Sequence, residues 1–400
     1  MLLRRGSRRG FGIIGGIDNK RHKVFDMKGK LQRRVWVEVD LGRLRGNYRR
    51  IAGAVRPAKV LCVLKANAYG LGVDRYAAAL AETDCVGFGV AEPHEALQLM
   101  PFGKPVQILS SILPDEIAPM VEAGVTLPVT DVATAKLIDR TARRLGRTAT
   151  VHFKIDTGMG RLGILASEAA DAIRRVAALE NLDCEGVFSH CPTAYDPADE
   201  FANDQISLFK SILKDVARDG IRFRKVHIAA SDAINNFPAA KRAPFNIVRT
   251  GINLHGSFDP NGRRVLKLES VLSLKTRVAQ VRTLPAGTTL GYGRTWCLSR
   301  QTKVATISAG YADGLPIALT NRGHVLINGA PCPVIGRISM DYTTVDVSKA
   351  GDVKAGDEVV ALGGTGKYAV TPDDWAALKG THAYDIICSF GNRVERVYRP

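Results

Sequence analysis

The sequence contains no run of about 18 or more uninterrupted apolar residues, and this absence excludes an ordinary membrane-spanning helix. It also lacks a disulfide framework, because its 7 cysteines are odd in number, scattered along the chain and without any CxxC pair. No repeat of about 20 to 50 residues is present, which argues against a solenoid. We therefore expect a protein of a reducing compartment, the cytoplasm, with no metal site and no membrane partner.

Acidic residues are scarce: Asp and Glu number 39 against 56 Lys and Arg, which gives a formal net charge of +17. Residues 1–34 contain 11 of the basic and 2 of the acidic residues, and so supply 9 of the 17 excess charges. This segment is rich in glycine, has no apolar periodicity and lacks the apolar stretch of a secretory signal. We predict a disordered basic extension that binds no nucleic acid. Met27, just before the first patterned segment, is a candidate natural start.

The rest of the chain has a globular composition, since 46% of all residues are hydrophobic and 24% are charged. From Val35 onward, short apolar runs alternate with stretches of helical periodicity. A first helix is expected over 40–55. Strand-like runs follow near residues 60–65, 85–90, 105–110, 126–130, 149–155, 184–189, 225–230 and 246–250. Amphipathic segments separate most of them, for example at 131–145, 168–179 and 205–218. Eight such alternations favour a parallel (β/α)8 barrel over residues 35–256 rather than an open doubly wound sheet.

After about residue 256 the pattern changes to a mainly β domain over residues 257–400. Strands are predicted over 268–284, 303–308, 324–327, 330–347 and 358–362, with one helix over 373–378. Turns rich in Gly, Pro and Asp separate them. The predicted fold is therefore α/β: a TIM-like barrel followed by a mainly β C-terminal domain.

The active site of such a barrel lies at the carboxyl ends of its strands. The first strand run ends in VLKANAYG, so Lys65 follows apolar residues where its ammonium would lose hydration. Loss of hydration favours the neutral amine, which is the form that can attack a carbonyl group to give a Schiff base. A lysine that only extends to the rim is the alternative explanation. The fifth run ends in HFKIDTGMGRLG, in which Arg161 offers a fork of donors suited to a carboxylate.

The last two runs end in HIAAS and NIVRTGI, in the loops where these barrels commonly hold a phosphate. Its ligands would be Ser231 and the backbone amides near Gly251 and Ile252. A serine in isolation is more often a turn or cap residue, so the coincidence of several strand ends carries the hypothesis. A phosphate site opposite a buried lysine suggests pyridoxal phosphate as the cofactor.

Four motifs are similar to those of a known family. VLKANAYGLG at 63–72, KIDTGMGRLG at 154–163, YADG at 311–314 and GRISMDYTTVDV at 336–347 resemble alanine racemase, a fold-type III pyridoxal phosphate enzyme. The resemblance covers about residues 36–400. It implies a homodimeric isomerase that interconverts L-alanine and D-alanine, the latter for peptidoglycan.

The resemblance also implies roles for the matching residues. Lys65 matches the lysine that holds the cofactor covalently. The other residues implied at the cofactor are Tyr69, His190, Ser231, Arg249, Gly251, Ile252 and Tyr384. Arg249 would face the pyridine nitrogen, where a permanently charged guanidinium disfavours protonation of that nitrogen and suppresses side reactions.

Inversion of a stereocentre by proton transfer needs an acid/base group on each face of a planar intermediate. By resemblance, Lys65 serves the D-alanine face, and Tyr292, lent by the second domain of a partner subunit, serves the L-alanine face. A free phenol is a poor base at neutral pH, so His190 and Arg249 are expected to supply cationic neighbours.

The substrate contacts implied by the resemblance are Arg161, Tyr311, Met340 and Asp341. Lys154 matches a lysine that family members can carry as a carbamate, an anion able to hold Arg161 in place.

Some positions depart from the family pattern. Cys191 and Pro192 follow the strand-six histidine, where an aromatic and small residues are usual, and Ala230 stands where an Asn usually precedes the phosphate serine. A racemase of broader substrate range is therefore the nearest alternative. A fold-type III decarboxylase is disfavoured because the second domain lacks the acidic-cysteine-glycine cluster of those enzymes. A non-catalytic carrier of pyridoxal phosphate is disfavoured because such carriers normally comprise the barrel alone.

Overall fold

The computed structural model describes residues 33–400, of which Arg34–Pro400 form one compact unit. The predicted basic extension, apart from its last two residues, and the candidate start at Met27 lie outside the described residues. Every cysteine lies inside them, and each is free. Over the same range, no helix combines the length and the apolar character needed to cross a membrane.

Eight parallel strands build the first part of the described chain, and each overlaps one of the eight predicted runs. One sheet contains, in spatial order, β10 (Ile247–Thr250), β2 (Lys59–Val63), β3 (Gly87–Val90) and β4 (Val106–Ile108). The other contains β5 (Leu127–Val129), β6 (Ala149–Asp156), β8 (Leu182–Phe188) and β9 (Lys225–His227), with short β7 (Ile164–Leu165) beside β6. A parallel bridge between Gln107 and Thr126 joins β4 to the start of β5. On the other side, Asn246 N donates to Val226 O at 3.0 Å, between β9 and the start of β10.

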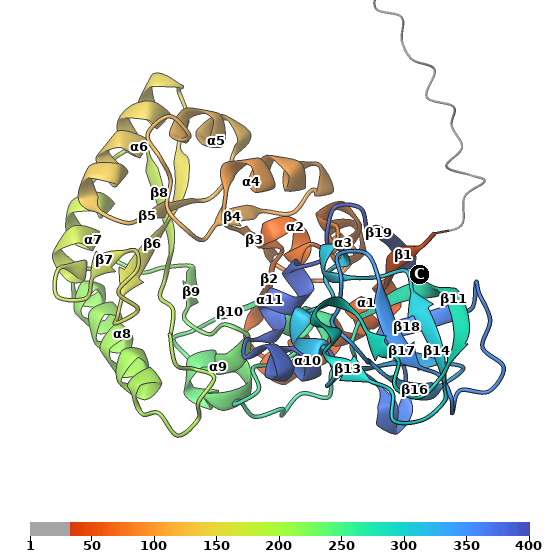
Figure 1. Cartoon of the computed structure of the whole chain (residues 1–400). Helices are drawn as coiled ribbons and strands as arrows, with labels where there is room; N and C mark the ends of the chain where they lie inside the picture. The colour runs from red at the N-terminus through yellow and green to blue at the C-terminus, as the bar shows by residue number, and fades with distance from the viewer. Residues whose placement is uncertain (1–32) are drawn as a thin grey trace, which may run out of the picture. The chain divides into compact units, whose positions relative to one another are not determined.

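Helices follow most of these strands. They are α1 (Leu41–Val55), α2 (Lys65–Tyr69), α3 (Val73–Ala81), α4 (Pro93–Leu99), α5 (Ile117–Ala123), α6 (Val132–Arg144), α7 (Ala169–Ala177), α8 (Phe201–Arg218) and α9 (Ser231–Asn236). Those from α4 to α8 form an outer arc around the strands (Figure 1). Two helices begin where the sequence predicts, because Asp40 accepts from Arg43 N at 2.8 Å and Asp131 accepts from Thr134 N at 2.7 Å. Each cap satisfies an amide that the first helical turn leaves without a partner.

The second part of the chain, together with the first strand β1, forms a mixed eight-stranded sheet. Its strands are β1 (Val35–Asp40), β11 (Leu272–Leu284), β14 (Thr302–Ile307), β15 (His324–Ile327), β16 (Ala330–Pro333), β17 (Thr343–Asp346), β18 (Glu358–Leu362) and β19 (Glu395–Arg399). The remaining elements are the hairpin strands β12 (Thr289–Leu290) and β13 (Trp296–Cys297), and the helices α10 (Pro372–Lys379) and α11 (Ala383–Cys388). Short 3-10 turns occur at η1 (Met100–Phe102), η2 (Pro238–Lys241), η3 (Ile252–His255), η4 (Tyr292–Arg294), η5 (Tyr311–Asp313), η6 (Ile317–Leu319) and η7 (Gly366–Tyr368). The strand predicted over 330–347 breaks into β16 and β17, because Gly336 turns the chain with a φ of 83°.

Strand β1 has no counterpart among the predicted strands. It pairs antiparallel with β11 and parallel with β19, and its residues Val37 and Val39 are fully buried. Both pairings join segments more than 200 residues apart, and a strand that depends on such distant partners has a weak local signal. The sheet of the C-terminal part therefore includes residues that precede the first helix.

The parallel strands and the mixed sheet share one hydrophobic core. At their junction, Tyr398 on β19 donates from Oη to Leu71 O at 2.9 Å, and Arg396 donates from Nε to Gly70 O at 3.0 Å. Gly72 makes this approach possible, because a Cβ there would lie 1.8 Å from the Tyr398 Oη and its φ of 99° is left-handed. The last strand, β19, is thereby attached to the turn between α2 and α3.

We expect Gly72→Ala to lower the free energy of unfolding by about 2 to 4 kcal/mol, because it combines a collision with Tyr398 and an unfavourable φ. Urea unfolding followed by circular dichroism measures the loss. Gly53→Ala in α1 is the matched control, because a Cβ there meets nothing within 4 Å. That change should stabilise the protein by about 0.5 to 1 kcal/mol through helix propensity. Equal stabilities for the two variants would contradict the proposed role of Gly72.

Candidate active site

A cavity of about 660 Å³ lies at the carboxyl ends of the parallel strands. Most of the predicted site residues line it, which places at one location side chains that are far apart in the sequence. These residues are Lys65, Tyr69, Lys154, Arg161, His190, Ser231, Arg249, Gly251 and Tyr384. Tyr384 comes from α11, so the C-terminal part of the chain closes one wall of the cavity.

Lys65 begins a left-handed turn that directly follows β2. The next four residues, Ala66 to Tyr69, all have φ between 50° and 58°, a conformation that costs roughly 1–2 kcal/mol for each residue with a Cβ. The turn is held by neighbours: Ala66 N donates to the Glu95 carboxylate, and Val73 N donates to Asn67 Oδ1 at 2.8 Å. Lys65 and Tyr69 both reach the cavity from this turn. Lys65 is exposed in the single chain, so the expected loss of hydration does not follow from the apolar strand before it.

Hydroxyl groups and a backbone amide form a small cradle at one end of the cavity. Gly251 N donates to Ser231 Oγ at 3.1 Å, and a Cβ on Gly251 would lie 1.9 Å from the Tyr69 Oη. The rings of Tyr69 and Tyr384 are 6.0 Å apart. Burial raises the pKa of both phenols, so both remain protonated and able to donate. Ile252, which starts η3 directly after Gly251, is fully buried and does not line the cavity.

Arg249 is the buried cation of the site. It donates to Ser189 O at 2.7 Å, to Ile228 O at 3.0 Å and to His227 Nδ1 at 2.7 Å. Burial lowers the pKa of its guanidinium to about 10, a value that still leaves it charged at neutral pH. The carboxyl ends of β8 and β9 thus supply the acceptors of Arg249.

Lys154 lies within β6 and donates from Nζ to Leu109 O at 2.6 Å. Burial, followed by the positive charges of Arg249, Arg161 and Lys65, lowers the pKa of its ammonium to about 8. Roughly one lysine in ten is therefore a neutral amine at pH 7. A primary amine in that state is a nucleophile.

His190 differs from the expectation that it supplies positive charge. Burial, and then the nearby cations led by Arg249, lower the pKa of its imidazole to about 3. Arg249 Nη2 lies 3.4 Å from His190 Nδ1, and a guanidinium can only donate, so the proton of the neutral ring resides on Nε2. Arg249, rather than His190, is the cationic member of this pair.

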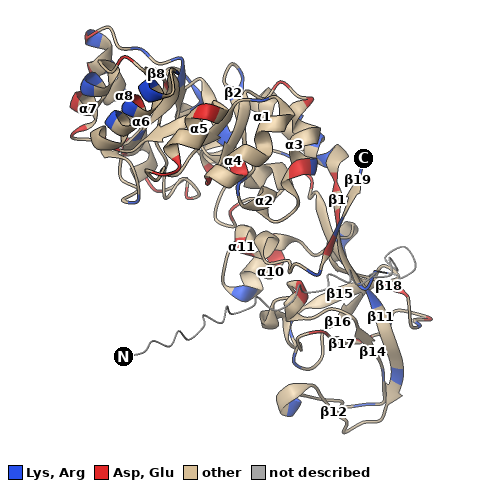
Figure 2. Ribbon diagram, turned by 90° about the horizontal axis from the view of Figure 1, so that it is seen from above, with Lys and Arg blue, Asp and Glu red and all other residues tan. Residues whose placement is uncertain are grey.

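Four predicted residues from the C-terminal part do not line this cavity: Tyr292, Tyr311, Met340 and Asp341. Tyr292 is 72% exposed and lies in η4, between β12 and β13. Figure 2 shows that the β12–β13 hairpin lies at the end of the mixed sheet away from the parallel strands. These four side chains therefore reach no catalytic position within a single chain.

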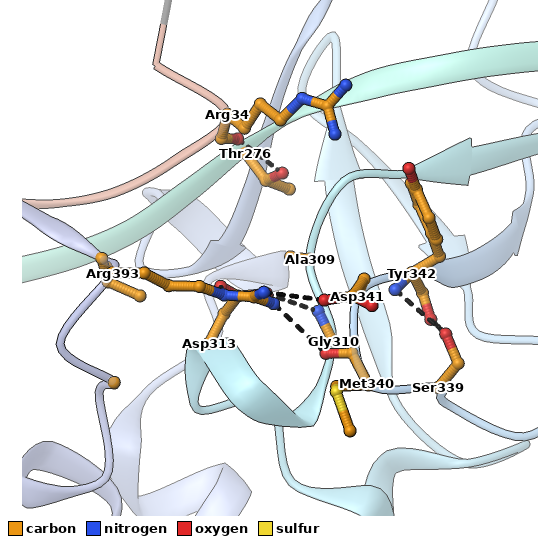
Figure 3. A network of polar contacts seen from close by, with 12 residues as sticks. Arg34, Thr276, Ala309, Gly310, Asp313, Ser339, Met340, Asp341, Tyr342 and Arg393 are labelled. Carbon is orange, nitrogen blue, oxygen red and sulfur yellow. Dashed lines mark hydrogen bonds and ion pairs between the residues drawn. The ribbon is translucent and has the colours of Figure 1, made fainter. Parts of the chain in front are cut away.

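A polar cluster holds the Met340 loop in place (Figure 3). Arg393 donates to Asp313 and to Asp341, each at 2.7 Å, and its Nη2 lies 3.4 Å from Met340 O. Asp313 is buried and also accepts from Gly310 N at 3.0 Å. One guanidinium thereby joins the turn at η5, the Met340 loop and the segment before β19. Asp341 supports the loop through this ion pair.

Several residues of the site were not singled out from the sequence. Asp232 lines the cavity immediately after Ser231, and burial, followed by Asp259, raises the pKa of its carboxyl to about 6. Its position after a strand end was a usable signal. Glu95, which holds the left-handed turn, comes from the start of α4, and nothing in its local pattern indicates that contact. Cys191, Pro192 and Ala230, the departures from the family pattern, also line the cavity.

We expect stability to fall as the pH is lowered from about 6.5, because buried imidazoles stay neutral in the folded chain. The pKa of His190 and of His255 is about 3, in both cases mainly because of burial. The unfolded chain binds a proton on each near pH 6.5, so each lowers the free energy of unfolding by about 1.4 kcal/mol per pH unit between about 6 and 3. His255→Gln should reduce this slope by about one proton in urea titrations at pH 5 to 6. His94→Gln, a surface replacement, is the matched control, and an unaltered slope in His255→Gln would contradict the argument.

Comparisons with known proteins indicate the family of the chain. The family model for the alanine racemase N-terminal domain matches residues 39–259, and that for the alanine racemase C-terminal domain matches residues 271–398. An alanine racemase of Symbiobacterium thermophilum is 36% identical over 369 residues, covering 92% of this chain and 97% of the relative. A crystal structure of alanine racemase from Streptomyces lavendulae has a TM-score of 0.85 at 31% identity, covering 92% of this chain and 98% of that one. The alanine racemase of Bartonella henselae, solved with covalently bound pyridoxal phosphate, has a TM-score of 0.82 at 29% identity, covering 92% and 100%. The chain belongs to the alanine racemase family.

Proposed function

We propose that this protein is a pyridoxal phosphate-dependent racemase that interconverts L-alanine and D-alanine and works as a homodimer with shared active sites. The observation that carries the proposal is the convergence of Lys65, the Arg249 guanidinium and a cradle of hydroxyls on one cavity. The D-alanine would serve peptidoglycan. The cytoplasmic location inferred from the cysteines stays a prediction.

The residues present fit pyridoxal phosphate. A Cβ at Gly251 would collide with the Tyr69 hydroxyl, so the cradle depends on the absence of a side chain there. Hydroxyls of Tyr69, Ser231 and Tyr384, with the amides of Gly251 and Ile252, suit a phosphate, which accepts hydrogen bonds on every oxygen. Lys65 and Arg249 line the same cavity, as a covalent anchor and a pyridine contact require.

The bound cofactor would withdraw electrons from the α-carbon of an attached amino acid and thereby acidify its α-hydrogen. Lys65 would hold the cofactor covalently, and its amine Nζ would move a proton on the D-alanine face. Arg249 would face the pyridine nitrogen and disfavour a proton there, because a guanidinium has five N–H donors and no acceptor. Arg161 offers a bidentate contact to the substrate carboxylate.

The second base is proposed to be Tyr292 of the partner subunit, which would move a proton on the L-alanine face. Exposed apolar side chains support this reading, since such a surface on a soluble chain marks an interface. They include Tyr292, Trp296, Tyr311, Met340 and Tyr342. Their segments adjoin one another: Tyr311 N donates to Ser339 O at 3.0 Å, and Gly291 packs against the backbone of Arg337. His190, neutral with its proton on Nε2, is suited to donate to the incoming phenolic oxygen.

Two finer structural points belong to the same proposal. We infer that the two parallel sheets close into one (β/α)8 barrel, and the bridge from β4 to β5 and the hydrogen bonds between β9 and β10 support closure. The predicted barrel range of 35–256 is too long at its start, because residues 35–40 form β1 of the mixed sheet. The mainly β domain over residues 257–400 would carry Tyr292 to the partner. Lys154 is proposed to react with carbon dioxide as a neutral amine, losing a proton and forming a carbamate that faces Arg161. Its lowered pKa supports that step.

Lys65→Ala should abolish covalent cofactor attachment and nearly all racemisation, because the anchor and one base are lost together. Tyr292→Phe should retain the cofactor but slow racemisation by about 100-fold to several thousand-fold, or roughly 3 to 5 kcal/mol. Cofactor absorbance and α-hydrogen exchange in deuterated solvent measure the two losses.

Racemisation rates for alanine, serine, lysine and arginine distinguish an alanine racemase from a racemase of broader substrate range. Release of carbon dioxide would instead indicate a decarboxylase.

A heterodimer of the two variants tests whether the sites are shared. Differently tagged Lys65→Ala and Tyr292→Phe chains are co-expressed and purified through both tags. If Tyr292 acts in the partner's site, the heterodimer has one intact and one doubly altered site and about half of the wild-type rate. If Tyr292 acts in its own site, both sites are defective and the heterodimer is as inactive as either homodimer. That second result would end the shared-site proposal.

A further inference from the structure

Four polar side chains form a continuous chain beneath the cavity, on strands β6, β8, β9 and β10. Arg249 Nη1 lies 2.7 Å from His227 Nδ1, His227 Nε2 lies 3.2 Å from His152 Nδ1, and His152 Nε2 lies 2.9 Å from Glu185 Oε2. Arg249 and both histidines are buried. Glu185 is the outer member, and it also forms an ion pair of 3.0 Å with Lys225.

The two ends of this chain determine where every proton lies. A guanidinium can only donate, so His227 Nδ1 must accept from Arg249 and the proton of His227 resides on Nε2. That N–H can only be donated to His152 Nδ1, so the proton of His152 also resides on Nε2. Its acceptor is the Glu185 carboxylate, which at neutral pH cannot donate. Both imidazoles are therefore neutral Nε2–H tautomers, with each hydrogen bond directed from Arg249 toward Glu185.

The fold is adapted locally to hold the two rings. The register between β6 and β8 shifts between Val151 and His152, where Glu185 is the extra, unpaired residue on β8. Gly186 on β8 leaves space for the ring, because a Cβ there would lie 2.7 Å from His152 Nε2. His227 stacks on Phe188 with centroids 5.1 Å apart and an interplanar angle of 5°. These contacts restrict both rings to the orientations that the chain requires.

The charges explain why such a chain would matter. Arg249 is a buried cation whose acceptors are three carbonyl oxygens and two imidazole nitrogens rather than a carboxylate. Glu185 is the acidic group that the chain connects to it. A carboxylate at the far end polarises the two neutral rings in turn, which makes His227 Nδ1 a stronger acceptor for the guanidinium. The carboxylate also prevents His152 from adopting the tautomer that would reverse the chain.

We propose that Glu185 and His152 are positioning residues that act through His227 to orient the Arg249 guanidinium and balance its charge. Arg249 lines the active-site cavity, whereas Glu185 and His152 do not. This proposal adds detail to the proposed function. Its kinetic test rests on the protein being a racemase. Its primary readout, the protonation of the two imidazoles, is independent of any catalytic activity.

The first test is the tautomer state of both rings in the purified full chain. Two-bond ¹H–¹⁵N spectra of chain labelled at histidine distinguish an Nε2–H from an Nδ1–H imidazole, and His152→Phe and His227→Phe assign the signals. We expect neutral Nε2–H rings at both positions. An Nδ1–H or doubly protonated His227 would overturn the proposal, whatever the protein catalyses.

The second test is a graded series at the outer end of the chain. Glu185→Gln retains an acceptor for His152 without the charge, and Glu185→Ala retains neither. We expect kcat for alanine to fall by about 10-fold to 100-fold in Glu185→Ala, as loss of an outer partner does at metal centres, and to fall less in Glu185→Gln. KM should change little, and the His152 and His227 nitrogen signals should shift in the same order. Lys225→Met removes the ion pair of Glu185 but leaves the chain intact, and should retain the wild-type kcat.

The outcomes separate the two proposals. Wild-type kcat and imidazole spectra in both Glu185 variants would overturn the positioning role while leaving the racemase proposal in place. An equal loss in Lys225→Met would also overturn it, because the ion pair rather than the chain would then be responsible. If Glu185→Ala fails to fold, the isosteric Glu185→Gln carries the test through its nitrogen shifts and kcat. A wild-type protein with the expected spectra but no racemisation would end the proposed function alone.

Discussion

The structure of the site depends on one buried positive charge. The Arg249 guanidinium has five N–H groups, and each one away from water needs an acceptor at a suitable angle. Carbonyl oxygens after β8 and β9 and the imidazoles of His227 and His190 provide them. Three parallel strands, β8, β9 and β10, must end in the correct register for Arg249 and these acceptors to meet, so the cation and the strand arrangement require each other.

In addition to burial, the positive charge of Arg249 lowers the pKa of two neighbouring groups, His190 and Lys154. It helps to keep His190 neutral, and together with burial it lowers the pKa of Lys154 to about 8. Both effects favour uncharged, hydrogen-bonding or nucleophilic forms at neutral pH. A site with several cations and few anions is suited to a ligand that carries negative charge, such as a phosphate with a phenolic oxygen and a carboxylate.

Much of the fold could be predicted because its signals are local. Caps such as Asp40 and Asp131 mark helix starts, and buried strands appear as short apolar runs, so all eight parallel strands overlap their predictions. Strand β1 could not be found in this way, since its partners lie near the other end of the chain. The charge state of His190 was also misjudged, because an imidazole's pKa depends on the cations and the burial around it. Lys65 is exposed although apolar residues precede it, because a left-handed turn starts there.

The sequence by itself determined the order of the eight parallel strands, the family, and the residue types at each strand end, because periodicity, caps and motifs indicate them. Only the tertiary structure decided which of those residues meet. It brings Lys65, Arg249, Ser231 and Tyr384 to one cavity and leaves Tyr292 exposed on a distant hairpin. It also aligns Glu185, His152 and His227 behind Arg249, since hydrogen-bond direction depends on distances between strands that no local pattern encodes.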